Sequence, residues 1–310
     1  MSGALRRAEA TLRRSCGDRV RTGFPMAPLT TFRIGGPAAL YLEVESEGDL
    51  AAVGEAIRET GLPHVVIGKG SNILVSDRGF DGLVLRLGKA YRWVARDGER
   101  LAAGGAMPLP ALAGVALSHS LSGLEFGVAI PASFGGAVRM NAGAHGHELG
   151  NVLHTIDVFI LTEGTARSIR AADAGFGYRS SRLPADGVVV GATMHLSPGD
   201  PAEIRRRMEE ARGQRRRTQP VAEPNCGSVF KNPPGDYAAR LIDEAGAKGM
   251  SVGGATVSRT HANFIVASEG ASAADVMALI HSIQDLVESR YSIRLEPEVH
   301  VVGDLGPSVG

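Results

Sequence analysis

Two kinds of hydrophobic spacing alternate along the chain, and together they predict an α+β fold. Apolar residues three or four positions apart follow capping signals at Ser46 and Ser272, which predicts amphipathic helices after both serines. Short apolar runs at 64–67 and 83–87 predict buried strands. The other expected helices cover 109–120, 203–217 and 237–245, and the other expected strands cover 73–75, 152–161, 188–196, 262–267 and 298–302.

A change in composition indicates the boundary between two folded regions. The stretch 198–224 is polar and ends in prolines, which is typical of a domain boundary. A chain of 310 residues also has room for about two domains. We therefore expect an N-terminal helical segment at 1–27, a first domain at 28–200 and a second domain at 201–310. The arginines of the helix at 203–217 indicate either a solvated face, balanced by nearby glutamates, or a binding role for one or two of them.

Charge and cysteine content narrow the classes of protein. Lys plus Arg equals Asp plus Glu at 33 each, so no net field favours nucleic acid or a membrane surface. The sequence has neither a signal-peptide pattern nor a run of about 20 apolar residues. Cys16 and Cys226 lie far apart and outside any metal or redox motif. We expect a cytoplasmic monomer without nucleic-acid or membrane partners.

Glycine is used about twice as often as average, with 41 residues, and it is concentrated in two loops. The first loop, 68–72, lacks the third glycine of a dinucleotide fingerprint and is followed by a strand, and it is not a P-loop. A pyrophosphate-binding turn and a plain tight turn both remain open. The second loop, 135–143, has room for a flat or phosphorylated ligand, or it packs closely against other backbone.

Reactive side chains occur in three further segments, around Arg179, Ser228 and Glu298. Taken singly, each is explained better by an ion pair or a turn hydrogen bond than by catalysis. The histidines at 145 and 147 do not complete a ligand set, so we expect no metal. No G-x-S-x-G sequence occurs, which argues against a hydrolase with a nucleophile elbow.

Together these segments resemble the UDP-N-acetylenolpyruvoylglucosamine reductase family, whose members complete UDP-N-acetylmuramate in peptidoglycan synthesis. The resemblance runs from about residue 29 to 303, and its specificity lies in the order and spacing of short motifs. These motifs are 30–37, 68–72, 123–126, 135–143, 178–179, 227–233, 261–264 and 295–299. The chain is similar to the shorter form of the family, which lacks an extra tyrosine-bearing loop.

The resemblance implies a fold and an activity. Residues 28–200 would form an FAD-binding domain of the vanillyl-alcohol-oxidase (PCMH) type in two subdomains, and 201–310 an α+β substrate-binding domain. The implied reaction is the reduction of UDP-N-acetyl-3-O-(1-carboxyvinyl)-glucosamine, with FAD as cofactor and NADPH as co-substrate. Two alternatives remain: another FAD oxidoreductase of the same fold, and a catalytically silent UDP-sugar-binding homologue.

The resemblance also implies roles for individual residues. Arg179 would hold the enolate charge, Ser228 would donate a proton, and Glu298 would lie near the enolate, protonated in a dry site. The implied FAD contacts are Arg33, Ile34, Gly35, Gly68, Lys69, Gly70, Ser71, Asn72, Ile130, Pro131, Ser133, Gly135, Gly136, Asn141 and Gly143. The implied substrate contacts are Tyr178, Lys231, Asn232, Asn263 and, from the arginines at 215–217, Arg216.

At three positions the chain departs from the family pattern. Ala129 and Ala132 flank an Ile-Pro pair where the family tends to carry glycine. Two additional methyl groups would either loosen FAD or be absorbed by a small loop shift. His300 stands where the family usually has Arg or Lys, so it either removes a surface charge or changes the setting of Glu298.

Overall fold

The computed structural model describes residues 2–305, and the chain forms two compact units. Unit 1 contains 1–22, 40–69 and 82–214, and unit 2 contains 23–39, 70–81 and 215–310. Each unit is therefore assembled from three separate stretches of chain. These units reflect which parts of the chain contact one another. The division into 1–27, 28–200 and 201–310 expected from the sequence is a different kind of division, and it stays a prediction.

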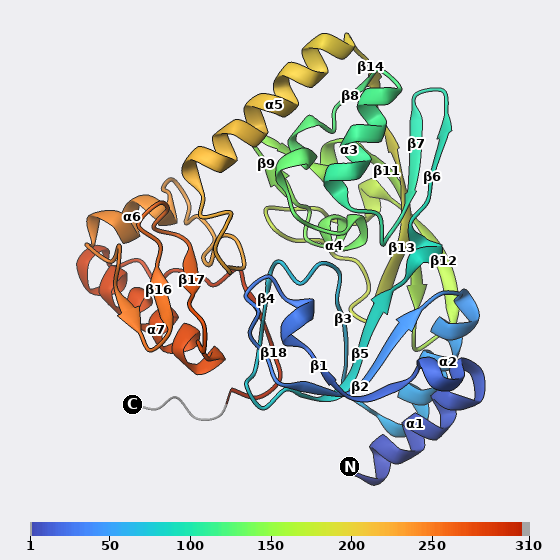
Figure 1. Ribbon diagram of the computed structural model, residues 1–310. Helices are drawn as coiled ribbons and strands as arrows, with labels where there is room; N and C mark the ends of the chain where they lie inside the picture. Colours follow the sequence, from blue (N-terminus) through green and yellow to red (C-terminus); the bar gives the residue numbers. More distant parts are fainter. Residues whose placement is uncertain (1, 306–310) are drawn as a thin grey trace. The chain divides into compact units, whose positions relative to one another are not determined.

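Helices and strands occur in both units (Figure 1). The α-helices are α1 (Gly3–Cys16), α2 (Glu47–Thr60), α3 (Leu109–Ser118), α4 (Phe134–Arg139), α5 (Pro201–Thr218), α6 (Ala238–Glu244) and α7 (Ala273–Tyr291). The strands are β1 (Arg21–Pro25), β2 (Pro37–Val44), β3 (His64–Val66), β4 (Ile73–Val75), β5 (Phe80–Leu87), β6 (Val94–Asp97), β7 (Arg100–Gly104), β8 (Leu121–Ser122), β9 (Gly143–Ala144), β10 (His147–Glu148), β11 (Leu153–Ile160), β12 (Thr165–Arg170), β13 (Gly187–His195), β14 (Ser197–Pro198), β15 (Ser251–Val252), β16 (Ala255–Val257), β17 (Ile265–Ala267) and β18 (His300–Val302). Between residues 2 and 305, none of the helices combines the length and apolar character needed to cross a bilayer.

The two helices expected after capping serines are confirmed. At α2, the Ser46 side chain accepts a hydrogen bond from the Asp49 N–H, and Gly61 ends the helix in a left-handed conformation with φ 63°. At α7, Ser272 and Asp275 form a reciprocal capping box. Local sequence alone specifies both helix starts, because each cap is made within four residues.

The core of unit 1 lies between an antiparallel sheet and two helices. The strand order is β12-β11-β13-β7-β6. Helices α3 and α4 lie beside this sheet (Figure 1), and their buried side chains join those of β7, β11 and β13 in one hydrophobic cluster. A second sheet has the order β1-β2-β5-β3, and β3 pairs in parallel with β5. The loops that follow β3, β7 and β13 are therefore each attached to a strand of a hydrogen-bonded sheet.

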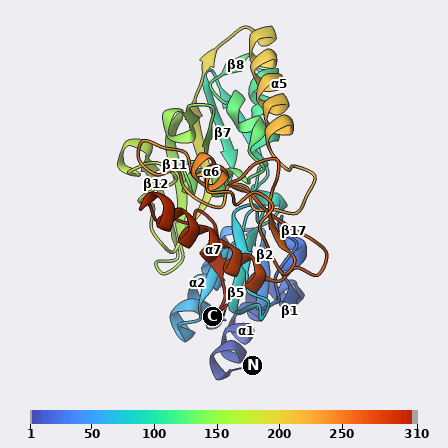
Figure 2. The ribbon, with the colours of Figure 1, turned by 90° about the vertical axis from the view of Figure 1, so that its left-hand side faces the viewer.

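In unit 2, α6 and α7 pack beside the three-stranded sheet β15-β16-β17 (Figures 1 and 2). A separate parallel pair joins β18 to β4, with His300 opposite Ile73. The strand expected at 298–302 is thus shorter than predicted, since it begins at His300. Glu298 and Val299 lie outside the β18–β4 pairing. The Glu298 N–H donates to the Val229 carbonyl and not to β4.

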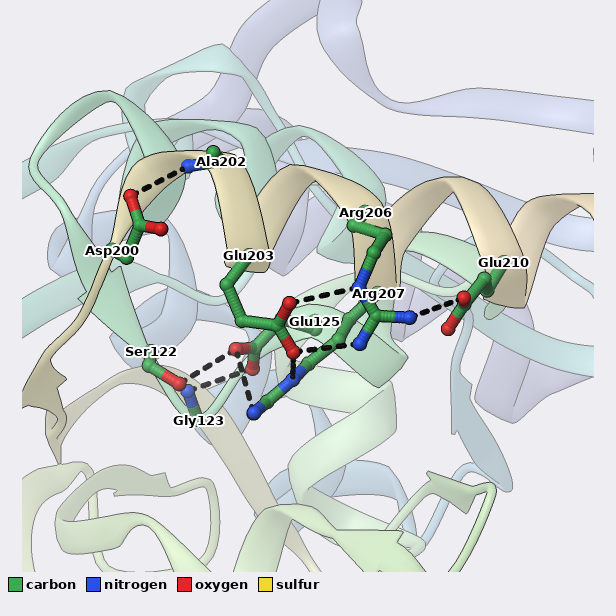
Figure 3. Close-up of polar contacts among 9 residues, drawn as sticks. All are labelled: Ser122, Gly123, Glu125, Asp200, Ala202, Glu203, Arg206, Arg207 and Glu210. Atoms are coloured by element: carbon green, nitrogen blue, oxygen red, sulfur yellow. Dashed lines mark hydrogen bonds and ion pairs between the residues drawn. The ribbon is translucent and has the colours of Figure 1, made fainter.

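The first half of the charged helix α5 buries Ile204 and Met208 and exposes its charged face to solvent. Glu203 accepts hydrogen bonds from Arg206 and Arg207, and Arg206 also reaches Glu210 (Figure 3). Arg207 lies 3.9 Å from Glu125, which itself accepts from the Gly123 N–H at 2.7 Å. For these two arginines the interpretation as a balanced surface is confirmed, and Glu125 serves as a turn cap.

A buried ion pair holds the start of α2. The Asp49 side chain is 6% exposed and accepts two hydrogen bonds of 2.6 Å from Arg19. It also accepts the Glu45 N–H at 2.8 Å. Burial opposes ionisation, but these hydrogen bonds outweigh it and lower the pKa of Asp49 to about 2. The carboxylate thus stabilises the folded state once pH exceeds its unfolded-state pKa of about 4.

We predict that Asp49→Asn lowers the free energy of unfolding of unit 1 by about 2 kcal/mol at pH 7. The difference from the parent should shrink as pH falls from about 4 towards about 2, where the parent loses the same ion pair. Urea titrations at several pH values measure it. Asp18→Asn, at a fully exposed aspartate, is the control. A difference that does not depend on pH would contradict the assignment.

Candidate functional site

A hollow in unit 1 brings together several sequence-predicted residues. The hollow is partly open to solvent. Gly68 and Lys69 reach it from the loop after β3, and Ser133, Gly135 and Gly136 reach it from the start of α4. The two glycine-rich loops recognised in the sequence therefore meet at one cavity.

Glycine is required here by close packing of the protein on itself. A Cβ on Gly68 would lie 2.1 Å from Ser133 Oγ, and one on Gly135 would lie 2.7 Å from the Val189 carbonyl oxygen. Gly105 has the same constraint, at 2.1 Å from the Val189 oxygen. These glycines thus pack closely against neighbouring parts of the protein, as the second interpretation of the glycine segments predicted. As a result, backbone atoms form part of the cavity wall.

Cationic side chains supply the charge of the hollow. Lys69, Arg86, Arg92 and Arg139 all line it. Burial lowers the pKa of Arg139, whose guanidinium stays charged and donates to the carbonyls of Pro184 and Gly187 at 2.7 and 2.5 Å. Sequence reasoning did not single out the three arginines. The signal for Arg86 is a charged residue inside the apolar strand β5.

These features fit the diphosphate-containing cofactor implied by the sequence. Four cations around a backbone-walled cavity suit an anionic, flat-ended ligand such as FAD. Gly68, Lys69, Ser133, Gly135, Gly136 and Arg139 would hold it, by backbone approach and by charge. Within residues 2–305 there is no group of three or more His, Cys, Asp or Glu side chains that could hold a metal ion.

Arg179 lies on a tight turn of unit 1. Gly177 and Ser180 exchange two backbone hydrogen bonds of 3.1 Å, which leaves Tyr178 and Arg179 at the tip. Arg179 has φ 53°, in the left-handed region that non-glycine residues seldom adopt. Its guanidinium carbon lies 5.3 Å from the centre of the Tyr178 ring. Strain of this kind is concentrated at functional sites.

In unit 2, the segment that carries Ser228 is fixed by backbone hydrogen bonds on both sides. The Val229 N–H donates to the Asn263 carbonyl at 2.9 Å, and the Glu298 N–H donates to the Val229 carbonyl at 2.7 Å. Gly227, with φ 81°, makes the sharp turn just before Ser228. Ser228 and Glu298, which are 70 positions apart in the sequence, thus belong to neighbouring backbone segments.

The Asn263 side chain completes this arrangement. It is 4% exposed, its Oδ1 accepts the Phe230 N–H at 2.9 Å, and its Nδ2 donates to the Phe230 carbonyl at 2.8 Å. A substrate contact was expected for this residue, but both of its polar atoms bond to the protein. Asn72, an expected FAD contact, donates from Nδ2 to the Glu298 carbonyl at 3.1 Å.

The electrostatic setting of this segment is set mainly by burial. Burial, with a smaller contribution from the nearby Glu298 charge, raises the pKa of the Cys226 thiol, which is therefore protonated at neutral pH. The His300 side chain is exposed, and partial desolvation by its neighbours, followed by the Lys231 charge, lowers its pKa. His300 is thus mostly neutral at pH 7, and it does not replace the positive charge of the family's Arg or Lys.

The remaining predicted substrate contacts are spread over unit 2 and the turn of unit 1. Lys231 pairs with Glu296 at 2.6 Å, and the Asn232 side chain accepts the Ala238 N–H at the start of α6. Tyr178 is 51% exposed. Arg216 is exposed on the last turn of α5.

The predicted FAD contacts at 33–35 and 70–71 also belong to unit 2. Arg33 is exposed at φ 59°, whereas the Ile34 side chain is buried in the core. A Cβ on Gly70 would lie 2.0 Å from the Leu29 carbonyl oxygen, and one on Gly35 would lie 2.7 Å from Val75 Cβ. Ser71 is half-buried beside Gly70. These glycines allow the two loops to pack tightly.

The two alanine departures lie in ordinary backbone conformations. Neither Ala129 nor Ala132 is among the residues with positive φ, so the fold does not require glycine at either position. Ile130 is half-buried and Pro131 exposed. The Ala132 carbonyl accepts the Leu109 N–H at 3.0 Å, which ties the loop to the start of α3. The loop accommodates both methyl groups without backbone strain.

Asn141 and Gly143 follow α4. Asn141 is fully buried, at 0% exposure, with Nδ2 on the Gly177 carbonyl and Oδ1 on the Gly150 N–H. Gly143 pairs with Glu148 in the short β9–β10 hairpin, where a Cβ would lie 2.5 Å from the His147 carbonyl oxygen. Both residues thus shape the chain around the second glycine loop.

Two family models match the chain. One, described as FAD binding domain, matches residues 38–169, and the other, described as UDP-N-acetylenolpyruvoylglucosamine reductase, C-terminal domain, matches residues 219–302. The expected fold class, an FAD-binding domain of the PCMH type followed by an α+β domain, is confirmed.

Proteins named UDP-N-acetylenolpyruvoylglucosamine reductase are similar over almost the whole chain. The one from Heliobacterium modesticaldum is 48% identical over 92% of this chain and 91% of its own. The one from an Anaeromyxobacter species is 44% identical over 98% and 96%. The crystal structure of the reductase from Thermus caldophilus aligns with a TM-score of 0.79 at 37% identity, and covers 91% of this chain and 98% of that one.

Sequence identity of this extent over nine-tenths of the chain, together with a matching fold, confirms the resemblance inferred from the motifs. The chain belongs to the UDP-N-acetylenolpyruvoylglucosamine reductase family.

Proposed function

We propose that this chain reduces UDP-N-acetyl-3-O-(1-carboxyvinyl)-glucosamine to UDP-N-acetylmuramate with electrons from NADPH, as a step of peptidoglycan precursor synthesis. FAD, held by the residues of the cavity, would supply the means of hydride transfer from NADPH to the methylene carbon of the substrate. The residues of the chain bind the two ligands, hold charge and supply a proton. We also propose that the enzyme acts as a cytoplasmic monomer.

Arg179 holds the negative charge that hydride arrival places on the carboxylate-bearing carbon. A guanidinium in a fixed position stabilises such charge better than water does, because it need not reorient during the reaction. The strained turn with φ 53° supports this role, since the fold maintains an unfavourable backbone conformation there. Tyr178, on the same turn, contacts the substrate.

Ser228 donates the proton to the carbon that carries the enolate charge, and Glu298 lies beside it. The observation that carries this assignment is the 2.7 Å hydrogen bond from the Glu298 N–H to the Val229 carbonyl, which sets the two residues on adjacent segments. Serine is a weak acid, so its competence depends on being held in place. Lys231, Asn232 and Arg216 provide polar contacts for the nucleotide sugar.

The function is tested by NADPH oxidation with FAD-loaded protein. NADPH should bleach the flavin absorption, and the UDP-sugar enol ether should restore it with stoichiometric product. Flavin bleached by a different donor and restored only by oxygen would indicate another oxidoreductase of this fold. Colourless protein that binds the UDP-sugar in a calorimeter would indicate a silent homologue.

We predict that Ser228→Ala lowers turnover by about 10³-fold, because the proton donor is lost. Bleaching of the flavin by NADPH should keep its rate, since that step does not use the proton. Stopped-flow absorbance measures the two steps separately. Ser251→Ala, at an exposed serine of β15 in the same unit, is the matched control. Turnover within a few fold of the parent in Ser228→Ala would contradict the role.

A second prediction concerns the cavity of unit 1. Gly135→Ala places a Cβ 2.7 Å from a carbonyl oxygen that has no freedom to rotate away, so α4 must shift. FAD affinity should fall by about tenfold, measured by titrating the FAD-free protein with fluorescence detection. The control is Gly114→Ala in α3, where a Cβ meets no atom within 4 Å. Unchanged FAD affinity in Gly135→Ala would contradict the placement of the cofactor in this cavity.

A further inference from the structure

The turn that carries Arg179 has two attachments to one helix end. The Gly177 carbonyl accepts a 3.0 Å hydrogen bond from Asn141 Nδ2, just beyond the last residue of α4. The Ser181 hydroxyl donates to the Arg139 carbonyl at 2.7 Å, at the last residue of the same helix. Both strands of the turn, before and after the tip, are therefore tied to the C-terminal end of α4.

Asn141 is suited to this task and to little else. It is 0% exposed, so a ligand has no access to its side chain in this conformation. Its Oδ1 accepts the Gly150 N–H at 2.8 Å, which fixes the orientation of the amide and turns Nδ2 towards the Gly177 carbonyl. Its backbone has φ 44°, which asparagine tolerates better than most residues. The amide also carries its donor and its acceptor on two separate atoms, as these two partners require.

The same short helix serves the cavity at its other end. Ser133, Gly135 and Gly136 line the hollow at the start of α4, five to eight residues before Asn141. The Arg139 side chain, also a lining residue, bonds to the carbonyls of Pro184 and Gly187. One rigid element in unit 1 therefore connects the cavity wall to the Arg179 turn.

We propose that Asn141 is a positioning residue for Arg179: its side-chain amide holds the Gly177 carbonyl and so maintains the left-handed backbone that orients the guanidinium. The proposal rests on the proposed function of Arg179. It assigns Asn141 to the turn rather than to the cofactor, although its neighbours in the sequence line the cavity.

The test uses Asn141→Asp in the full FAD-loaded enzyme. Aspartate keeps the Oδ1 acceptor for Gly150 and tolerates the positive φ, but once ionised it sets an oxygen against the Gly177 carbonyl in place of a donor. Because burial raises the pKa of a carboxyl group, the rates are compared over a range of pH, and the defect should grow as pH rises. Asn151→Asp is the matched control, because Asn151 is exposed and its Oδ1 accepts the Glu148 N–H in the same way. FAD affinity and the bleaching of flavin by NADPH should stay within about threefold of the parent. Recovery of flavin absorption with the UDP-sugar substrate should slow by about 10²-fold.

A second readout does not depend on activity. Amide hydrogen exchange in the segment 175–182 should speed up by roughly tenfold or more in Asn141→Asp, with or without FAD, and should be unchanged in Asn151→Asp. In the double variant with Arg179→Ala, the loss in substrate reduction should not exceed that of Arg179→Ala alone, because the two residues act through one guanidinium.

Three outcomes would overturn the inference. Slowing of both half-reactions together, or loss of FAD, would make Asn141 a general structural or cofactor residue. Multiplying losses in the double variant would show that it acts independently of Arg179. If Asn141→Asp reduces the substrate at the parent rate while Arg179→Ala is slow, only the role of Asn141 is excluded. If Arg179→Ala itself reduces the substrate at the parent rate, the proposed role of Arg179 is excluded.

Discussion

The pair of hydrogen bonds between the Asn263 side chain and the Phe230 backbone is the constraint on which the arrangement of unit 2 depends. Asn263 is 4% exposed, so these bonds form away from competing water and leaving them unmade would be costly. They hold the segment after Ser228 in one register. The Lys231 N–H can then donate to the Glu296 carbonyl, and the Glu298 N–H to the Val229 carbonyl. The position of Glu298 is thus a consequence of how Asn263 is bound.

Unit 1 uses the same device at a different place. Asn141 bridges the Gly177 carbonyl and the Gly150 N–H, as Asn263 bridges both polar groups of one residue. In each case a buried side-chain amide bonds to backbone groups of a short segment outside the main sheets. Loops normally move more than the elements they connect. A loop whose carbonyl or N–H is held by a buried amide loses that freedom, which suits a site where charge and proton must be delivered from fixed positions.

Local features of the fold were predictable from the sequence, and features made by distant residues were not. Ser46 and Ser272 predicted the starts of α2 and α7, because a helix cap is formed within four residues. The glycine loop at 68–72 was located correctly, whereas the second one was wrong in part, because Gly135 and Gly136 lie in α4 and not in a loop. The family resemblance implied ligand contacts for Asn141 and Asn263, and these contacts stay predictions, although the polar side-chain atoms of both residues bond to the protein. Their partners lie 36 and 33 positions away, and no local pattern identifies them. Arg86 and Arg139 were missed for the same reason, because only the fold brings β5 and α4 to one cavity.

The central claim is that the functional segments are held in place by the protein before any ligand binds. Hydrogen exchange of the individual backbone amides of Val229, Phe230, Glu298 and His300, in protein free of substrate and NADPH, measures this most directly. The hydrogen bonds from these amides predict slow exchange, little changed when the UDP-sugar substrate is added. Fast exchange that becomes slow only with substrate would contradict the account, because the ligand and not the buried asparagine would then order the site.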